Sequence, residues 1–255
     1  MSDADFLFTR REQLLAILPA FAAFALLGEA RAQAPARRGS VRTWIDSQDE
    51  IARALTGGAM TGRQWAIEVE RLGRSVDVAE LMAEVGRARL TAAGAPFGND
   101  PRKRFVRFLD ANGTPRRLSY GVALFDFAPY NVITPHGHRH MVSAHMVVSG
   151  AFRVRNFDRL RDEGEAMVIR PTRDYVAQVG EVSTMCSERD NIHWFVPQNG
   201  PATTFDVIIS GLDAGRPDHE IRAIDPVGGE RLADGSIRAP IIGFAEASRR
   251  YPASV

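Results

Sequence analysis

Pro135 to Gly150 reads PHGHRHMVSAHMVVSG and holds four of the six histidines of this 255-residue chain. His136 and His138 are two residues apart, and alternate residues of a β-strand point to the same face of a sheet. Two imidazoles on one face can bind one ion, and histidine is the commonest metal ligand in proteins. A fifth histidine, His193, lies in a second apolar run that is typical of a strand. The stretch therefore predicts a β-sheet protein with a metal site.

The chain after about residue 104 is a series of short apolar and β-branched runs separated by Gly, Pro, Asn and Asp. This spacing is typical of a β-sandwich or barrel. Hairpin turns are expected at Asp110–Gly113 and at Asp234–Gly235. Strands are expected over residues 105–109, 118–127, 141–154, 166–169, 175–179, 192–196, 203–209 and 236–242. The last ten residues are expected to form a loose tail.

The residues before these strands, from about 44 to 93, have the spacing of helices. Two amphipathic stripes should pack on the sheet; they are Trp65, Val69, Leu72 and Val78, Leu81, Met82, Val85. Capping boxes are expected in three pairs: Ser47 with Glu50, Thr61 with Gln64, and Asp77 with Glu80. The sequence therefore predicts a helical region over residues 40–94 that packs on a β domain over residues 95–245.

Residues 1–34 have the features of an export signal. Arg10 and Arg11 lie in a segment that resembles a twin-arginine motif, and an apolar run and small residues suited to cleavage follow. The apolar run, Leu14 to Leu27, is short for a membrane-spanning helix. We therefore expect a periplasmic protein with no stable membrane association after cleavage. An uncleaved anchor or a buried helix is the alternative.

The composition limits the classes of partner. Lys and Arg number 32 against 31 acidic residues, so the net charge is +1 and no nucleic-acid partner is expected. The hydrophobic content of 45% is ordinary for a globular domain. Cys186 is the only cysteine, which excludes an internal disulfide, and we interpret it as a small buried hydrophobe.

The spacing of His136, His138 and Gly150 resembles the first signature of the cupin family, in which two histidines and a later glutamate precede a glycine. Ser143 holds the glutamate position, so His193 is the expected third ligand. A three-histidine site without a carboxylate resembles the thiol dioxygenase branch of that family. Cupins are double-sheet jelly rolls. The implied fold is a mainly-β double-stranded β-helix barrel with an N-terminal helical region.

Further segments resemble plant cysteine oxidases and cysteamine dioxygenase, so that the resemblance covers roughly residues 95 to 213. They are Gly150–Leu160 (GAFRVRNFDRL), Asn191–Phe195 (NIHWF) and Thr204–Ile208 (TFDVI). The resemblance implies Fe(II), a small thiol and O2 as substrates, and a sulfinate product. Ligand type alone suits zinc, iron, copper or nickel. Cupins often pair through sheet edges, so the resemblance also makes a homodimer an expectation.

The chain departs from those oxidases at Leu212, where they have a pocket tyrosine. Two other functions therefore stay open. One is a cupin oxygenase or isomerase that acts on a non-thiol. The other is a non-catalytic periplasmic cupin that binds a metal or a ligand.

His145 and Asp206 are the candidate catalytic residues. His145 shares the face of Ser143, so it is a pocket acid–base group, an alternative ligand or a hydrogen-bonded core residue. Asp206 matches a family aspartate near the substrate, where it would orient a substrate amine or a metal ligand. The alternative for Asp206 is a structural acid bonded to the backbone.

Other residues have weaker assignments. His140 is expected in the turn after the His-x-His strand, and the shifted ligand set His138, His140 and His145 is an alternative. Three arginines have the planar donor fork that binds a substrate carboxylate; they are Arg153, Arg155 and Arg170.

Overall fold

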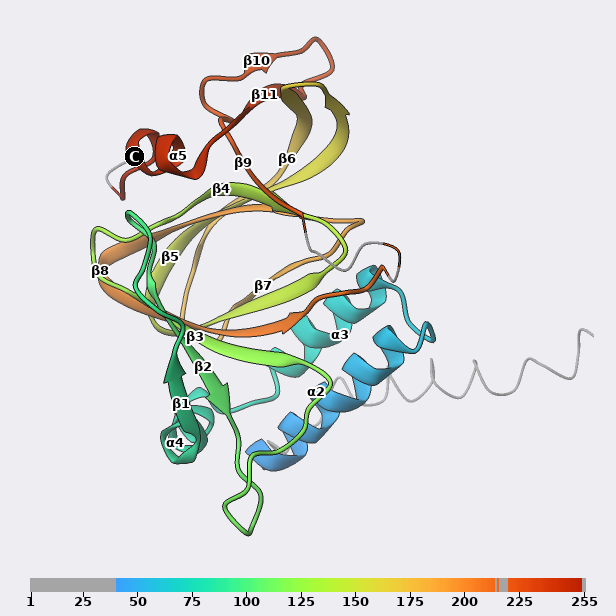
Figure 1. Cartoon of the computed structure of the whole chain (residues 1–255), viewed down its shortest axis with the longest axis vertical. Coiled ribbons are helices and arrows are strands. Elements are labelled where there is room, and N and C mark those ends of the chain that lie inside the picture. The colour runs from blue at the N-terminus through green and yellow to red at the C-terminus, as the bar shows by residue number, and fades with distance from the viewer. Residues whose placement is uncertain (1–39, 214, 216–219, 254–255) are drawn as a thin grey trace, which may run out of the picture. The chain divides into compact units, whose positions relative to one another are not determined.

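The computed structural model describes residues 40–213, 215 and 220–253 (Figure 1). The predicted signal segment, residues 1–34, lies outside these described residues. None of the helices in the described part is long and apolar enough to span a bilayer. The elements are α2 (Val41–Thr56), α3 (Gly62–Gly73), α4 (Val78–Arg87), β1 (Arg89–Ala92), β2 (Arg102–Arg107), β3 (Gly121–Phe127), β4 (Ile133–His138), β5 (Val142–Glu163), β6 (Ala166–Ala177), β7 (Val182–Met185), β8 (Ile192–Ile209), β9 (Ile221–Ile224), β10 (Glu230–Arg231), β11 (Ile237–Ile242) and α5 (Phe244–Arg250).

Two long antiparallel strands, β5 and β8, form the centre of the β structure. They pair from Val142 opposite Ile209 to Phe157 opposite Ile192. Each contains a residue with positive φ near its middle, Gly150 in β5 and Asn199 in β8. The register shifts there, but the pairing resumes beyond it. The sequence predicted two separate strands where β8 runs as one, because a local pattern does not show that pairing continues past an irregularity.

Gly150 is required at this position by its conformation and its surroundings. Its φ is +70°, and a Cβ atom there would lie 2.7 Å from the carbonyl oxygen of Pro201 and 2.7 Å from Cβ of Ala202. Glycine alone avoids both problems. The glycine that completes the opening stretch of sequence therefore allows β5 to pass close to β8.

The strands form two layers that share β5 and β8. In the first layer, β1, β2, β3, the C-terminal half of β8, the N-terminal half of β5 and β7 pair in that order. In the second, the N-terminal half of β8 connects through β4, β9, β11 and β6 to the C-terminal half of β5, which closes a ring. This mainly-β arrangement is the double-stranded β-helix, or cupin jelly roll, that the sequence predicted.

The N-terminal helices α2, α3 and α4 pack on one face of the first layer, and Figure 1 shows α2 and α3 beside it. Both predicted amphipathic stripes pack there, so that prediction is confirmed. The helix side chains include Trp44, Trp65, Val69, Leu72, Leu81 and Val85. The strand side chains include Val122, Leu124, Val142, Ala144, Met146, Phe205, Val207 and Ile209. Burying each large apolar side chain contributes about 1.5–3 kcal/mol.

Two of the three predicted helix starts are correct. The capping box of Thr61 and Gln64 begins α3, and the Asp77 side chain accepts hydrogen bonds from two backbone amides at the start of α4. The predicted cap at Ser47 is wrong, because α2 begins earlier with Ser40 as its N-cap.

The ends of the domain differ from the sequence-based expectation. Strand β1 already pairs with β2 within the range expected to be helical. The expected loose tail is wrong, because these residues include most of α5 and the buried side chain of Tyr251. The Tyr251 ring packs 4.9 Å from that of Trp194, and its hydroxyl donates to Asp225. These are tertiary contacts, which a local pattern of small and polar residues does not show.

Candidate metal centre

Three histidines meet where β4 lies beside the N-terminal half of β8. His136 and His138 come from β4, and His193 comes from β8, directly opposite His136. One nitrogen of each lies within 4.8 Å of the others, an arrangement that can hold a metal ion. The Nε2 atoms of His136 and His193 are 3.2 Å apart. Two nitrogens at about 2.1 Å from one ion lie roughly 3 Å apart, so this separation fits a shared metal.

A backbone contact determines which nitrogen of His136 faces the cluster. Nδ1 lies 2.8 Å from the carbonyl oxygen of Thr134. A carbonyl only accepts, so Nδ1 donates its proton and Nε2 has a free lone pair toward His193. Burial lowers the pKa of His136 to about 4, although the Thr134 contact opposes this. Burial, and then the neighbouring histidines, hold the pKa of His193 well below its ordinary value. Neutral imidazoles are the form that binds metals.

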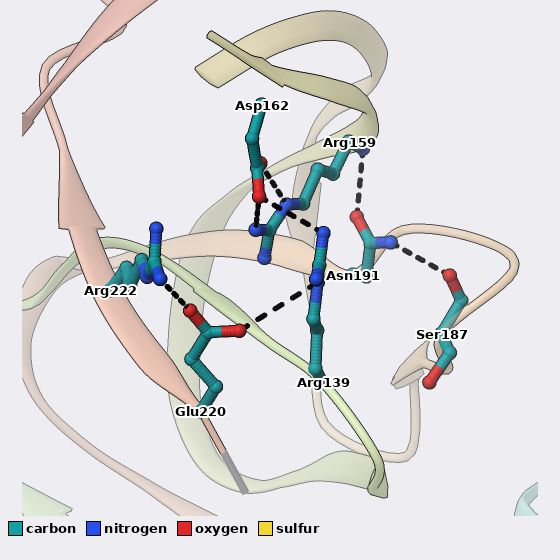
Figure 2. Close-up of polar contacts among 7 residues, drawn as sticks. All are labelled: Arg139, Arg159, Asp162, Ser187, Asn191, Glu220 and Arg222. Atoms are coloured by element: carbon teal, nitrogen blue, oxygen red, sulfur yellow. Dashed lines mark hydrogen bonds and ion pairs between the residues drawn. The ribbon is translucent and has the colours of Figure 1, made fainter. Parts of the chain in front are cut away.

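Charged side chains hold the loop that follows His138 (Figure 2). Arg139 donates to Asp162 at 3.1 Å, and its Nε lies 3.8 Å from a carboxylate oxygen of Glu220. Asp162 also pairs with Arg159, and Glu220 pairs with Arg222. This network joins β4, β5 and β9 just past the His-x-His pair, so it restrains the end of β4.

Asn191 holds the start of β8 in the same region (Figure 2). Its side-chain oxygen accepts from the backbone amide of Arg159 at 2.8 Å, and its side-chain nitrogen donates to the carbonyl of Ser187 at 2.8 Å. Its own carbonyl accepts from the backbone amide of His138 at 3.0 Å. Asn191 therefore connects the strand of His138 to that of His193, two residues farther on.

The three histidines lie on the wall of a cavity of about 640 Å³. Most of the wall is apolar. Its other polar side chains are Asp100, Lys103, Thr134, Ser143, His145, Asp206 and Ser210. Among the described residues that form this wall there is no arginine, tyrosine or cysteine. The cavity therefore has the size for a small molecule, and the histidines form one polar end of the cavity.

The two candidate catalytic residues, His145 and Asp206, lie directly opposite each other on β5 and β8. His145 Nδ1 is 2.7 Å from Asp206 Oδ2, and His145 Nε2 is 2.8 Å from the hydroxyl of Ser143. A carboxylate accepts, so Nδ1 donates to Asp206 and Nε2 accepts from Ser143. The centre of the His145 ring lies 4.9 Å from that of His193. This hydrogen-bonded chain of three side chains can move a proton beside the cluster.

The other sequence candidates lie elsewhere. His140 has a φ of +57° and faces Asp213 at 3.4 Å. In the part of the chain that the structure describes, the only group of three that could hold an ion is His136, His138 and His193, so the shifted set with His140 is not assembled. Burial raises the pKa of the Cys186 thiol to about 11, and its side chain packs in the helix-side core.

Arginines do not supply the positive charge of the cavity wall. Arg153 and Arg155 both face Asp174, and Arg170 is absent from the described residues of the wall. Lys103 lies there instead, together with Ser143. Sequence reasoning assigned no role to Lys103. The available signal was its uniqueness, because every other basic residue among the 32 is an arginine.

Comparison with known proteins found only distant structural likenesses. No family model and no curated protein matches the chain. Among solved structures, a protein with a double-stranded β-helix domain from Klebsiella pneumoniae is 13% identical and covers 51% of this chain and 84% of its own, with a TM-score of 0.33. KdgF from Halomonas sp. is 16% identical over 46% of this chain and 84% of its own, with a TM-score of 0.32. Oxalate oxidase with glycolate is 20% identical over 51% of this chain and 59% of its own, with a TM-score of 0.34.

These structural similarities assign no function to this chain. The strand order and the histidine cluster themselves define its class, which is a double-stranded β-helix protein with a three-histidine site able to hold a metal ion.

Proposed function

We propose that the protein is an exported Fe(II)-dependent dioxygenase that oxidises a small thiol to a sulfinate with O2. The observation that carries the proposal is a cluster of three histidines, without a carboxylate among them, on the wall of a cavity of small-molecule size. The resemblance of the sequence to thiol dioxygenases is the reason for choosing iron and a thiol. The twin-arginine-type segment in residues 1–34 is the reason for choosing export.

The donor set fits such an ion. His136 presents the lone pair of Nε2, and the lowered pKa values of His136 and His193 keep both rings neutral at pH 7. His193 Nδ1 is buried and without a hydrogen-bond partner among the described residues. Iron, when held by these three histidines, would supply the binding of a thiolate and the activation of dioxygen.

The protein's own residues would manage the proton of the thiol. The thiol must lose its proton to bind as a thiolate, and Ser143 and His145 lie on the cavity wall to receive it. Asp206, fully buried and bonded to His145 Nδ1, would stabilise the imidazolium that forms. Both atoms of O2 end on sulfur, so no further reductant is needed.

A second candidate is an oxygenase or isomerase that acts on a non-thiol, and Leu212 favours it. The related oxidases have a pocket tyrosine at this position. Leu212 instead packs against the helix-side core, and it is absent from the described residues of the cavity wall. A non-catalytic metal-binding role would appear as stoichiometric metal without turnover.

The test begins with the metal content of protein purified without oxygen. We expect about one iron per chain in the wild type and in His140→Ala, and loss of iron in His136→Ala and His193→Ala. Oxygen consumption that depends on an added thiol would then support the dioxygenase. Iron with turnover of a non-thiol alone would favour the second candidate. The absence of metal from wild-type protein, even after Fe(II) is added, would contradict both.

A further inference from the structure

Lys103 is the single lysine among the 32 Lys and Arg residues of the chain, and it lies on the wall of the metal cavity. The strand register explains its position. Lys103 on β2 is directly opposite Phe125 on β3, and Phe125 is opposite Thr204 on β8. Residues directly opposite each other share a face of a sheet. Asp206 lies two residues after Thr204 on β8, so Lys103 and Asp206 are on the same face. They are two strands apart, about 10 Å across the sheet.

The ammonium of Lys103 lies over two aromatic rings of the cavity wall. Its Nζ atom is 4.9 Å from the centre of the Phe105 ring and 5.2 Å from that of Phe125. Aromatic faces attract a cation and hold it in place. They do not neutralise its charge.

Among the described residues, Lys103 takes part in no ion pair. Its neighbours Arg102 and Arg104 differ, because both pair with Asp126. Burial lowers the pKa of Lys103, and the negative charge of Asp206 opposes this shift. Asp206 is itself hydrogen-bonded to His145. A partly buried cation without a paired carboxylate is costly, and an anionic ligand offsets that cost.

We propose that Lys103 binds the carboxylate of the substrate and so selects small carboxylates over neutral molecules. The inference rests on the proposed function in one respect, since it takes the histidine cluster as the place of the reacting group. The substrate is then a short thiol with a carboxylate at its other end. Asp206, close to the cluster, repels that carboxylate and favours the orientation in which it meets Lys103. Lysine suits this role as a compact charge on a flexible stem.

The first test compares two thiols that differ in charge, 3-mercaptopropionate and 3-mercapto-1-propanol, on the iron-loaded full chain. In wild type, kcat/KM from oxygen uptake should be at least about 10-fold higher for the carboxylate, as expected for a hydrogen bond between charged groups. Lys103→Met should bring the ratio close to one, and Lys103→Arg should restore part of it. Arg102→Met removes the same charge one residue away on the opposite face, and it should keep the wild-type ratio.

The second test needs no turnover. Lys103 is the only lysine, so acetylation of a lysine by an activated ester, read by peptide mass, reports on this one side chain. Propionate should slow the acetylation, whereas propionamide and sodium chloride at equal ionic strength should not. Protection by propionate without oxidation of any thiol would support the Lys103 site and contradict the thiol dioxygenase. Equal oxidation of both thiols, with no protection by propionate, would overturn the Lys103 site and leave the dioxygenase standing.

Discussion

The two faces of strand β8 in the first sheet layer differ in chemistry, although one strand forms both. On β8, Phe205, Val207 and Ile209 pack under the helices. The alternate residues Asp206 and Ile208 line the cavity. A shift of the register by one residue would exchange the two sets. The alternation of side chains along the strand therefore decides whether a residue packs in the core or lines the cavity.

On β8 the cavity face has buried polar groups where the helix face has apolar ones, and this has a cost in stability. Asp206 is fully buried, and one oxygen of its carboxylate bonds to His145. Its other oxygen and the hydroxyl of Thr204 are buried without a hydrogen-bond partner among the described residues. Unpaired buried polar atoms reduce stability. The helix face has the opposite property, because its apolar contacts stabilise the fold and take no part in the site.

The largest expected effect on folding is on the helix face. Phe205 is 1% exposed, and its ring lies 6.0 Å from that of Trp44 and 6.4 Å from that of Phe108. Phe205→Ala should lower the free energy of unfolding by about 3–5 kcal/mol, because it leaves a cavity in this core. Urea denaturation measures the change. Folded Phe205→Ala should bind metal as the wild type does.

Thr204→Val is the matched control on the opposite face, one residue away. It removes a buried hydroxyl that has no partner among the described residues, so it should leave the free energy of unfolding unchanged or raise it by about 1 kcal/mol. A loss of stability in Thr204→Val as large as that in Phe205→Ala would contradict the division between the two faces.

An intermediate effect should appear when the pH is lowered in protein stripped of metal. His136 has a pKa of about 4 in the folded protein and an ordinary value of 6.5 when unfolded. Between these values the unfolded chain binds a proton that the folded one does not, so stability falls as the pH falls from 6.5 to 4. Above 6.5 His136 has no effect. The decrease for this residue is at most about 3 kcal/mol.

Urea denaturation at pH 7 and at pH 5 measures this dependence. His136→Gln should lose less stability between the two pH values than the wild type does. An identical decrease in both proteins would show that His136 does not titrate in the folded state as its burial implies.

At Asp206 we expect a smaller effect on folding than at Phe205 or His136, together with a large effect on activity. Asp206→Asn keeps the size of the side chain but removes the charge that holds the His145 proton. It should cost about 1–2 kcal/mol of stability and lower kcat by roughly 100-fold or more. Iron content should not change. Oxygen uptake across a range of pH gives the measurement, and loss of iron from Asp206→Asn would instead assign Asp206 to holding the metal site together.

The sequence predicted much of the fold and only part of the site. The spacing of His136 and His138 predicted a shared face, and the resemblance to the cupin signature, carried in part by the spacing to Gly150, implied the jelly roll. The contact of His145 with Ser143 was not predicted, although both were placed on one face, because a shared face does not give side-chain orientation. Lys103 was missed because it lies between Arg102 and Arg104, and a short basic run has the same local pattern on any exposed strand.

The sequence by itself determined local properties: amphipathic helices, strand alternation and a His-x-His pair. Tertiary structure alone decided which strands meet. His136 and His193 are 57 residues apart in sequence, and His145 and Asp206 are 61 apart, yet each pair is directly opposite in a ladder. The physical reason is that register between distant strands depends on the packing of the whole barrel, whereas periodicity depends only on the backbone geometry of a single strand.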